Sequence, residues 1–304
     1  MAEDLRKYID PAVINKISRL ELKARHIVEG FVAGMHKSPY KGFSVEFAEH
    51  REYSPGDDLR HLDWKVFGRS DRLMLKEYEL ETNLRTHVLL DTSSSMEYQS
   101  SDQSKLELGC FIAASMSYLI LRQQDSVSIT TFDKEVRQRL PSSNAMGHMR
   151  NILMALGGAR PQETTDINTV FRATAERIGR RSLVIVISDL FDDPDRILKA
   201  LGHFRHRRHD VIVFHVLDEH ELTFPFLRLT QFEGLEQPEL KLRVDPEALR
   251  RAYLEEVNLF CKQMERGCTG MMVDYHRIST DQRLDAALAG YLVKRLGTRM
   301  RARG

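Results

Sequence analysis

The chain has 304 residues, with 45 basic and 44 acidic side chains and a formal net charge of +1. This balance argues against a nucleic-acid-binding protein, which usually carries a basic excess. The three cysteines, Cys110, Cys261 and Cys268, form no CxxC pair, so neither a disulfide framework nor a zinc site is indicated. Cys110 lies in an apolar helical stretch and is expected in the core.

The first ten residues, MAEDLRKYID, lack the apolar centre of a signal peptide. No run of the sequence approaches the roughly 18 apolar residues that a membrane helix needs. We therefore expect a cytoplasmic protein without a membrane span.

The first part of the chain differs in pattern from the rest. Apolar residues at helical spacing predict a helix over 11–35, and the stretch that follows mixes short strand-like pieces with turns such as 54–57. We predict an N-terminal helical and β-rich subdomain at 1–85, a main domain at 86–297 and a basic tail at 298–304.

Within the main domain, predicted strands alternate with predicted helices. The apolar runs LVIVI and VIVF are typical of strands that are covered on both faces. The alternation predicts an α/β fold with a doubly wound, mostly parallel sheet. The expected strands are 87–91, 125–132, 182–189 and 210–218, and the expected helices are 104–123, 145–157, 167–179, 194–205, 246–265 and 281–296.

Three separate stretches place oxygen-bearing side chains where strands end or helices begin. Asp91, Ser93 and Ser95 follow the first strand, Asp189 follows LVIVIS, and Thr165 lies in a loop that enters a helix. Ligands of open parallel sheets bind beyond the carboxyl ends of the strands, so these groups are expected to meet there.

This set of oxygens suits a hard divalent cation, Mg²⁺ or Mn²⁺. The hydroxyls of Ser93, Ser95 and Thr165 are neutral ligands, while Asp91 and Asp189 balance the charge. With few anionic ligands, the ion keeps a position for a carboxylate from another molecule. The alternative is structural: serines and threonines after strands, and Asp166, often cap helices.

Asp91-Thr92-Ser93-Ser94-Ser95 resembles the DxSxS signature of von Willebrand factor A domains. Their metal-ion-dependent adhesion site also uses a threonine and an aspartate from two later loops. The resemblance implies these roles for Thr165 and Asp189. Glu163-Thr164 stands where the family often has two glycines, which leaves Thr164 as an alternative ligand.

A second stretch, REYSPGDDLRHLDWKVFGR, is similar to the signature of the bacterial family called domain of unknown function fifty-eight. Members of that family tend to accompany MoxR-type AAA+ ATPases, so the resemblance implies such a partner. The likeness covers about 15–295. It is carried by Arg51, Tyr53, Pro55, Gly56, Asp57, Asp58, Arg60, Asp63 and Trp64.

The GDDLRHLDW stretch has two interpretations. Its aspartates and Arg60 would pair to anchor the subdomain while Trp64 fills a pocket, or they would form a second polar surface for a partner. HFRHRRHD, at 203–210, is interpreted as the basic end of a helix that complements the helix dipole.

Three functional hypotheses follow. The first is a metal-dependent protein-interaction module that works as an adaptor for a MoxR-type ATPase. The second is an Mg²⁺-dependent hydrolase or phosphotransferase that uses Asp91 or Asp189. Against it, Ser93 stands where phosphatases carry a second aspartate, and no Walker A, GxSxG or HExxH motif is present. The third is a scaffold with a vestigial metal site.

Overall fold

The computed structural model describes residues 50–52, 64–70, 72–76, 84–162, 164–179, 181–235 and 241–282. The chain divides into two compact units, one of which spans Ala33–Asn83. The described elements of that unit are β1 (His50–Glu52), α2 (Trp64–Ser70) and β2 (Met74–Lys76), with β1 and β2 paired antiparallel. The predicted helix at 11–35 and the basic tail lie outside the described residues, and the predicted division at residue 85 stays a prediction.

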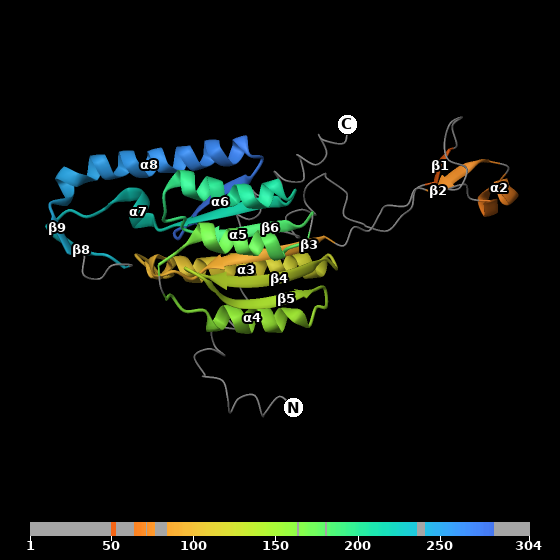
Figure 1. Ribbon diagram of the computed structural model, residues 1–304, viewed down its shortest axis with the longest axis horizontal. Coiled ribbons are helices and arrows are strands. Elements are labelled where there is room, and N and C mark those ends of the chain that lie inside the picture. Colours follow the sequence, from red (N-terminus) through yellow and green to blue (C-terminus); the bar gives the residue numbers. More distant parts are fainter. Residues whose placement is uncertain are drawn as a thin grey trace, which may run out of the picture. The chain divides into compact units, whose positions relative to one another are not determined.

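The larger unit is built on a six-stranded sheet in the order β10-β7-β6-β3-β4-β5 (Figure 1). All neighbouring strands are parallel except β5, which runs antiparallel to β4 at one edge. Numbered along the chain, these six strands have the order 3-2-1-4-5-6 of doubly wound sheets. The strands are β3 (Arg85–Asp91), β4 (Ser126–Phe132), β5 (Val136–Ser143), β6 (Leu183–Ser188), β7 (Asp210–Leu217) and β10 (Asp274–Ser279).

Helices cover both faces of this sheet (Figure 1). α3 (Lys105–Arg122) and α4 (His148–Gly158) pack on one face. The other face is covered by α5 (Ile167–Arg177), α6 (Pro194–His206) and α8 (Pro246–Gly270). The prediction of an α/β fold with a doubly wound, mostly parallel sheet is therefore confirmed.

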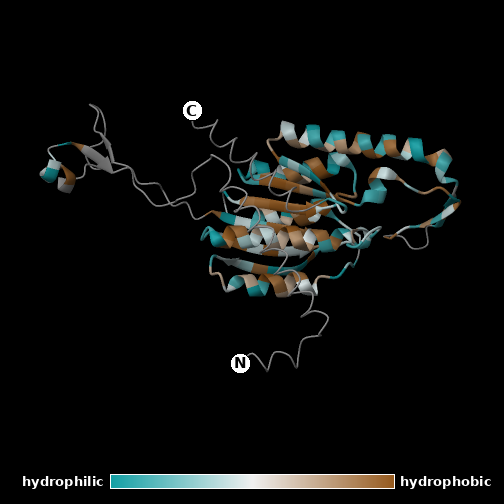
Figure 2. Ribbon diagram, turned by 180° about the vertical axis from the view of Figure 1, so that it is seen from behind, coloured by the Kyte–Doolittle hydropathy of each residue, from teal (hydrophilic) through white to brown (hydrophobic). Residues whose placement is uncertain are grey.

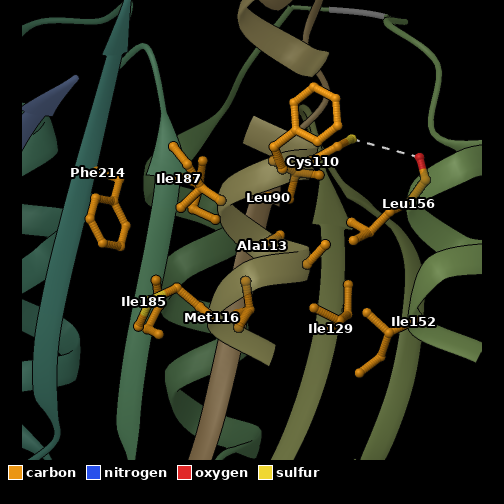
Figure 3. Close-up of a cluster of buried hydrophobic side chains, with 14 of the residues drawn as sticks. Leu90, Cys110, Ala113, Met116, Ile129, Ile152, Leu156, Ile185, Ile187 and Phe214 are labelled. Carbon is orange, nitrogen blue, oxygen red and sulfur yellow. Dashed lines mark hydrogen bonds between the residues drawn. The ribbon is translucent and has the colours of Figure 1, made fainter. Parts of the chain in front are cut away.

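Alternating side chains of the central strands pack into two separate hydrophobic cores, one on each face of the sheet. In β3, Val88 and Leu90 join the core under α3, and Leu89 joins the opposite core. Figure 3 shows the first of these, with α3 lying over the strands and the thiol of Cys110 3.6 Å from the carbonyl oxygen of Leu156. Burying one such aliphatic side chain contributes about 1.5–3 kcal/mol, so the double-sided core accounts for the continuous apolar runs.

Several elements were not predicted from the sequence. β5 and β10 are edge strands with many polar residues, which is why no apolar run marked them. By contrast, the outer helix α8 was predicted, and it shows both teal and brown residues in Figure 2, as expected for a helix with one buried face. The remaining unpredicted elements are α2, η3 (Ser94–Glu97), α7 (Glu219–Thr223) and the hairpin of β8 (Thr230–Glu233) and β9 (Lys241–Val244).

The expected helices other than 281–296 are present with shifted ends, and 283–296 lies outside the described residues. Helix starts follow the sequence closely. Asp193 accepts hydrogen bonds from the amides of Asp195 and Arg196, and Ser104 accepts one from Glu107, as N-cap residues do. In the described part of the chain, no helix combines the length and the apolarity needed to cross a membrane.

Candidate metal centre

Asp91 is the last residue of β3 and is fully buried. Its Oδ1 accepts hydrogen bonds from the amide of Ser93 at 2.9 Å and from the hydroxyl of Thr165 at 3.4 Å. Its Oδ2 accepts one from the hydroxyl of Ser188 at 2.6 Å. This carboxylate therefore joins three stretches: the loop after β3, the loop before α5 and the end of β6.

The hydroxyl oxygens of Ser93 and Ser95 lie 3.0 Å apart, and both residues are buried. Ser93 occupies the N-cap position of η3, yet its side chain makes no capping hydrogen bond. Helix capping therefore does not explain Ser93. The structural interpretation does hold for Asp166, whose carboxylate accepts a hydrogen bond from the amide of Thr169 and caps α5.

Backbone and hydroxyl contacts hold the two loops together. Thr92 donates from both its amide and its hydroxyl to the carbonyl of Phe132, at 2.7 and 3.0 Å, which fixes the loop to the end of β4. Gln162 donates its amide to the carbonyl of Thr92 at 3.0 Å and accepts a hydrogen bond from the hydroxyl of Ser94. These contacts bring Thr165 beside Asp91, whereas Thr164 is exposed.

Asp189 follows β6 directly and is 5% exposed. Its Oδ2 accepts a hydrogen bond from the ammonium group of Lys105 at 2.7 Å. Among the residues that the structure describes, no group donates to its buried Oδ1. A buried carboxylate oxygen without a donor is costly, so this atom calls for a cation or an ordered water.

The charge of Asp189 disfavours the ionised form of Asp91. Burial raises the pKa of Asp91 to about 7, and the negative charge of Asp189 adds to the increase. The hydrogen bonds from Ser188 and Ser93 act in the opposite direction but are outweighed. A bound cation would stabilise both carboxylates and reverse this shift.

Lys105 and Ser188 were not predicted as part of this site. Lys105 is the first residue of α3 and is 2% exposed, with its ammonium nitrogen 2.7 Å from both Asp189 and Glu221. Burial by itself lowers the pKa of Lys105, but the charges of these two carboxylates outweigh it and raise the pKa above its ordinary value. The available signals were a charged residue opening an apolar helix and a serine next to Asp189.

His215, on β7, holds the backbone of Asp189 in place through a hydrogen bond. Its Nε2 donates to the carbonyl oxygen of Asp189 at 2.9 Å, and its Nδ1 lies 2.5 Å from the hydroxyl of Tyr275. Burial lowers the pKa of His215 to about 4, so the ring is neutral near pH 7. After Asp189 the chain turns through Leu190, which has a positive φ of 53°, and leaves Phe191 69% exposed.

The donor set fits a hard cation better than a soft one. Serine and threonine hydroxyls, two carboxylates and one buried oxygen without a donor suit Mg²⁺ or Mn²⁺. In the described ranges, no three histidine, cysteine, aspartate or glutamate side chains are grouped as ligands of one ion. A site of the zinc type is therefore not found there.

Asp192 is a further acidic residue, three positions after Asp189. Asp192 accepts a hydrogen bond from the amide of Asp193 and lies 3.9 Å from Arg196. The basic stretch 203–210 spans the end of α6 and the turn that follows, as interpreted from the sequence. The residues of GDDLRHLD lie outside the described residues, and Trp64 begins α2.

The chain is a doubly wound α/β protein that gathers hydroxyl and carboxylate oxygens at the carboxyl ends of β3 and β6. The chain belongs to the family described as "Protein of unknown function DUF58", whose model matches residues 49–259.

Among curated proteins, the chain is 25% identical over 222 residues to "Uncharacterized protein Rv1480" of Mycobacterium tuberculosis, which covers 71% of this chain and 68% of that protein. It is 27% identical over 179 residues to "Uncharacterized protein YeaD" of Bacillus subtilis, covering 57% and 41%. Similar solved structures include BatB from Bacteroides thetaiotaomicron, with a TM-score of 0.45, 14% identity and coverage of 69% of this chain and 98% of that one. The SpRpn10 VWA domain has a TM-score of 0.37, 9% identity and coverage of 66% and 91%.

Proposed function

We propose that this chain is a protein-interaction module whose binding depends on a divalent cation, Mg²⁺ or Mn²⁺. The observation that carries the proposal is the buried Oδ1 of Asp189, which has no donor among the described residues and belongs to a carboxylate that acts electrostatically on Asp91. A cation between hydroxyl oxygens and these carboxylates would relieve both unfavourable features.

Each residue of the site has a distinct role in this proposal. The hydroxyls of Ser93, Ser95 and Thr165 would ligate the ion as neutral oxygens, and Asp91 and Asp189 would balance its charge. Asp91 also orients the loops, because it accepts hydrogen bonds from Ser93 and Thr165. When bound, the ion supplies an electrophilic position that a carboxylate from another molecule can take.

The partner would therefore present an aspartate or a glutamate. Phe191 is 69% exposed and lies two residues after Asp189, so it offers an apolar contact next to that carboxylate. An acidic residue flanked by an apolar one matches this pair of features.

We further propose that the module works in the cytoplasm as an adaptor for a MoxR-type AAA+ ATPase, in chaperone-like or complex-assembly work. The support is the family membership together with the resemblance of REYSPGDDLRHLDWKVFGR to MoxR-associated proteins. The metal centre would then be the position at which a client or the ATPase docks.

Calorimetric titration with Mg²⁺ and with Mn²⁺ tests the metal dependence. Wild-type protein is expected to bind one ion, and Asp91→Ala is expected to abolish binding. Asp102→Ala, which removes an exposed carboxylate in the same part of the chain, serves as the control and should bind normally. A wild-type protein that binds neither ion contradicts the proposal.

A pull-down with a purified MoxR-type ATPase, repeated in EDTA, tests the adaptor role. Capture in Mg²⁺ that is lost in EDTA and in Asp91→Ala supports it. Capture that is insensitive to both would place the contact elsewhere on the chain.

The alternative is a hydrolase or phosphotransferase. It needs Asp91 as a nucleophile or Asp189 as a general base; both oxygens of Asp91 already accept hydrogen bonds from the protein, which disfavours the first of these roles. Turnover of p-nitrophenyl phosphate in Mg²⁺ that disappears in Asp91→Asn would favour this alternative over the interaction module.

A further inference from the structure

A buried lysine lies against the candidate metal centre. Lys105 is 2% exposed, and its ammonium group is 2.7 Å from Oδ2 of Asp189 and 2.7 Å from Oε1 of Glu221. A buried ammonium persists only where carboxylates compensate its desolvation. Lys105 therefore depends on both of these partners, one of which also belongs to the candidate metal centre.

Glu221 is held in place from its other side. Its Oε2 accepts a hydrogen bond from the amide of Asp218 at 2.7 Å, and this bond is half of the capping box that begins α7. Both oxygens of Glu221 are therefore engaged, one by the start of α7 and one by Lys105. The position of Glu221 is set by α7, so Glu221 competes with Asp189 for the ammonium group from a fixed place.

Because of Lys105, the two carboxylate oxygens of Asp189 have different surroundings. Oδ2 is occupied by the ammonium group, and Oδ1 is buried without a donor in the described part of the chain. Only Oδ1 is left for an ion or for water bound to an ion. The positive charge on Lys105 also opposes a second cation nearby, whereas the negative charge on Glu221 weakens that opposition.

We infer that the positive charge of Lys105 lowers and thereby sets the affinity of this site for a divalent ion, and that the negative charge of Glu221 partly offsets this effect. The inference rests on the proposed metal-dependent function and adds to it the residues that tune the site. In the absence of a metal, Lys105 balances the charge of Asp189. When a metal binds, the ammonium group limits how strongly Asp189 attracts it.

The two residues are expected to act in opposite directions. Lys105→Met removes the competing positive charge and should tighten binding of Mg²⁺ and Mn²⁺ by about tenfold or more. Glu221→Gln keeps the lysine but removes the negative charge that offsets it, and should weaken binding of Mg²⁺ and Mn²⁺ by about threefold or more. If Lys105 and Glu221 merely supported the fold, both substitutions would weaken binding.

The experiment is calorimetric titration of the full chain with MgCl₂ and MnCl₂ at constant pH and ionic strength. Lys199→Met and Glu219→Gln are matched controls, because Lys199 is exposed on α6 and Glu219 lies in α7 without a side-chain contact to Lys105. Both controls should stay within about twofold of wild type, since the exposed charge of Lys199 is screened and Glu219, which is half-buried, forms no ion pair with Lys105. Unchanged or weaker binding by Lys105→Met, or tighter binding by Glu221→Gln, overturns the inference.

Lys105→Met will also lose stability in chelator, because it leaves the buried Asp189 and the half-buried Glu221 without the ammonium group. Thermal unfolding in EDTA and in rising MgCl₂ covers this case: the variant should gain more in melting temperature from Mg²⁺ than wild type does. An equal or smaller gain counts against the inference. If Lys105→Met does not fold at all, Lys105→Gln, which removes the charge but keeps a hydrogen-bond donor for Asp189 and Glu221, replaces it in both measurements with the same expected direction.

The outcomes also separate this inference from the proposed function. Wild-type protein that binds neither Mg²⁺ nor Mn²⁺ overturns both. Wild-type protein that binds an ion, with variants that do not change in opposite directions, leaves the metal-dependent module standing and removes only the role of Lys105.

Discussion

The two ends of the central sheet carry opposite charges in different surroundings. Asp91 and Asp189 lie at the carboxyl ends of β3 and β6, and both are buried. At the amino ends of the same two strands lie Arg85 and Arg181, which are exposed. A pocket of about 730 Å³ also opens near the amino ends, lined by Ile178, Arg181, His206, Arg207 and Arg208.

Charge has different consequences in these two places. Exposed arginines near the end of a helix are solvated and complement the helix dipole, so they need no partner. Buried carboxylates are stable only with a compensating cation or with donors for each oxygen. The carboxyl end therefore has an internal ammonium, Lys105, and still leaves one oxygen of Asp189 without a donor among the described residues.

The largest expected effect comes from removing a carboxylate at the buried end. Asp189→Ala leaves Lys105 buried with Glu221 alone and should lower the free energy of unfolding by about 3–5 kcal/mol. Urea unfolding in EDTA measures this without a contribution from metal. A loss below about 1 kcal/mol would mean that water solvates the ammonium group and that the two ends do not differ in this respect.

The second prediction concerns pH and the polar start of β3. Burial lowers the pKa of His87 to about 4, and its Nδ1 lies 2.7 Å from the hydroxyl of Ser128. Between pH 6.5 and 4 the unfolded chain binds a proton at His87 and the folded chain does not. Stability from this residue is therefore complete above pH 6.5 and is lost as the pH falls to 4, by about 3 kcal/mol.

Denaturant unfolding of wild type and His87→Gln over this pH range measures the effect, and the free energy of unfolding of the variant should fall less as the pH is lowered.

Asp91, at the other end of the same strand, is expected to change stability with pH in the opposite direction. Its raised pKa means that in EDTA its ionisation costs stability as the pH rises from about 4 to about 7. Asp91→Asn should remove that cost, and a variant with the wild-type profile would contradict the assignment.

The third prediction tests how closely α3 must approach the sheet to place Lys105. A methyl group on Gly109 would lie 2.9 Å from Cδ1 of Leu90 and 3.3 Å from Cγ2 of Ile187. Gly109→Ala should therefore destabilise the protein by about 1–3 kcal/mol. Gly158→Ala is the matched control, because nothing lies within 4 Å of its added methyl group. Thermal unfolding of both variants measures the difference, and equal losses would contradict it.

The smallest effects are expected at the exposed end. Arg181→Ala and Arg207→Ala remove exposed side chains and should change the free energy of unfolding by no more than about 0.5 kcal/mol. Neither should change the affinity for Mg²⁺, which calorimetry would show. A larger loss of stability from either variant would mean that the arginines of the amino end have structural partners after all.

The comparison also shows how far sequence reasoning reached. The strands β6 and β7 were predicted to within one residue at each end, because covered strands are continuous apolar runs. β10 reads DYHRIS, which has no such run, and it forms through parallel pairing with β7. The predicted interior helices begin where caps such as Asp193 indicated, since capping is a local interaction.

The residues of the candidate site also differ in how far they could be predicted, according to whether their partners are near or far along the chain. Asp91, Ser93 and Ser95 are close in the chain, so a short motif was enough to indicate them. Lys105 could not be assigned this way, because its partners Asp189 and Glu221 are 84 and 116 residues away. Which of Thr164 and Thr165 lies beside Asp91 also depends on distant contacts, through the hydrogen bonds that join Gln162 to Thr92 and Ser94.

The sequence by itself determined the alternation of strands and helices, the doubly wound sheet and the cluster of oxygens after β3. These features follow from periodicity, capping and short motifs, which act over a few residues. The tertiary structure alone decided which charges are buried and which of them meet. Burial and ion pairing depend on where distant strands end, and that is why the ammonium group of Lys105 became visible only in the folded chain.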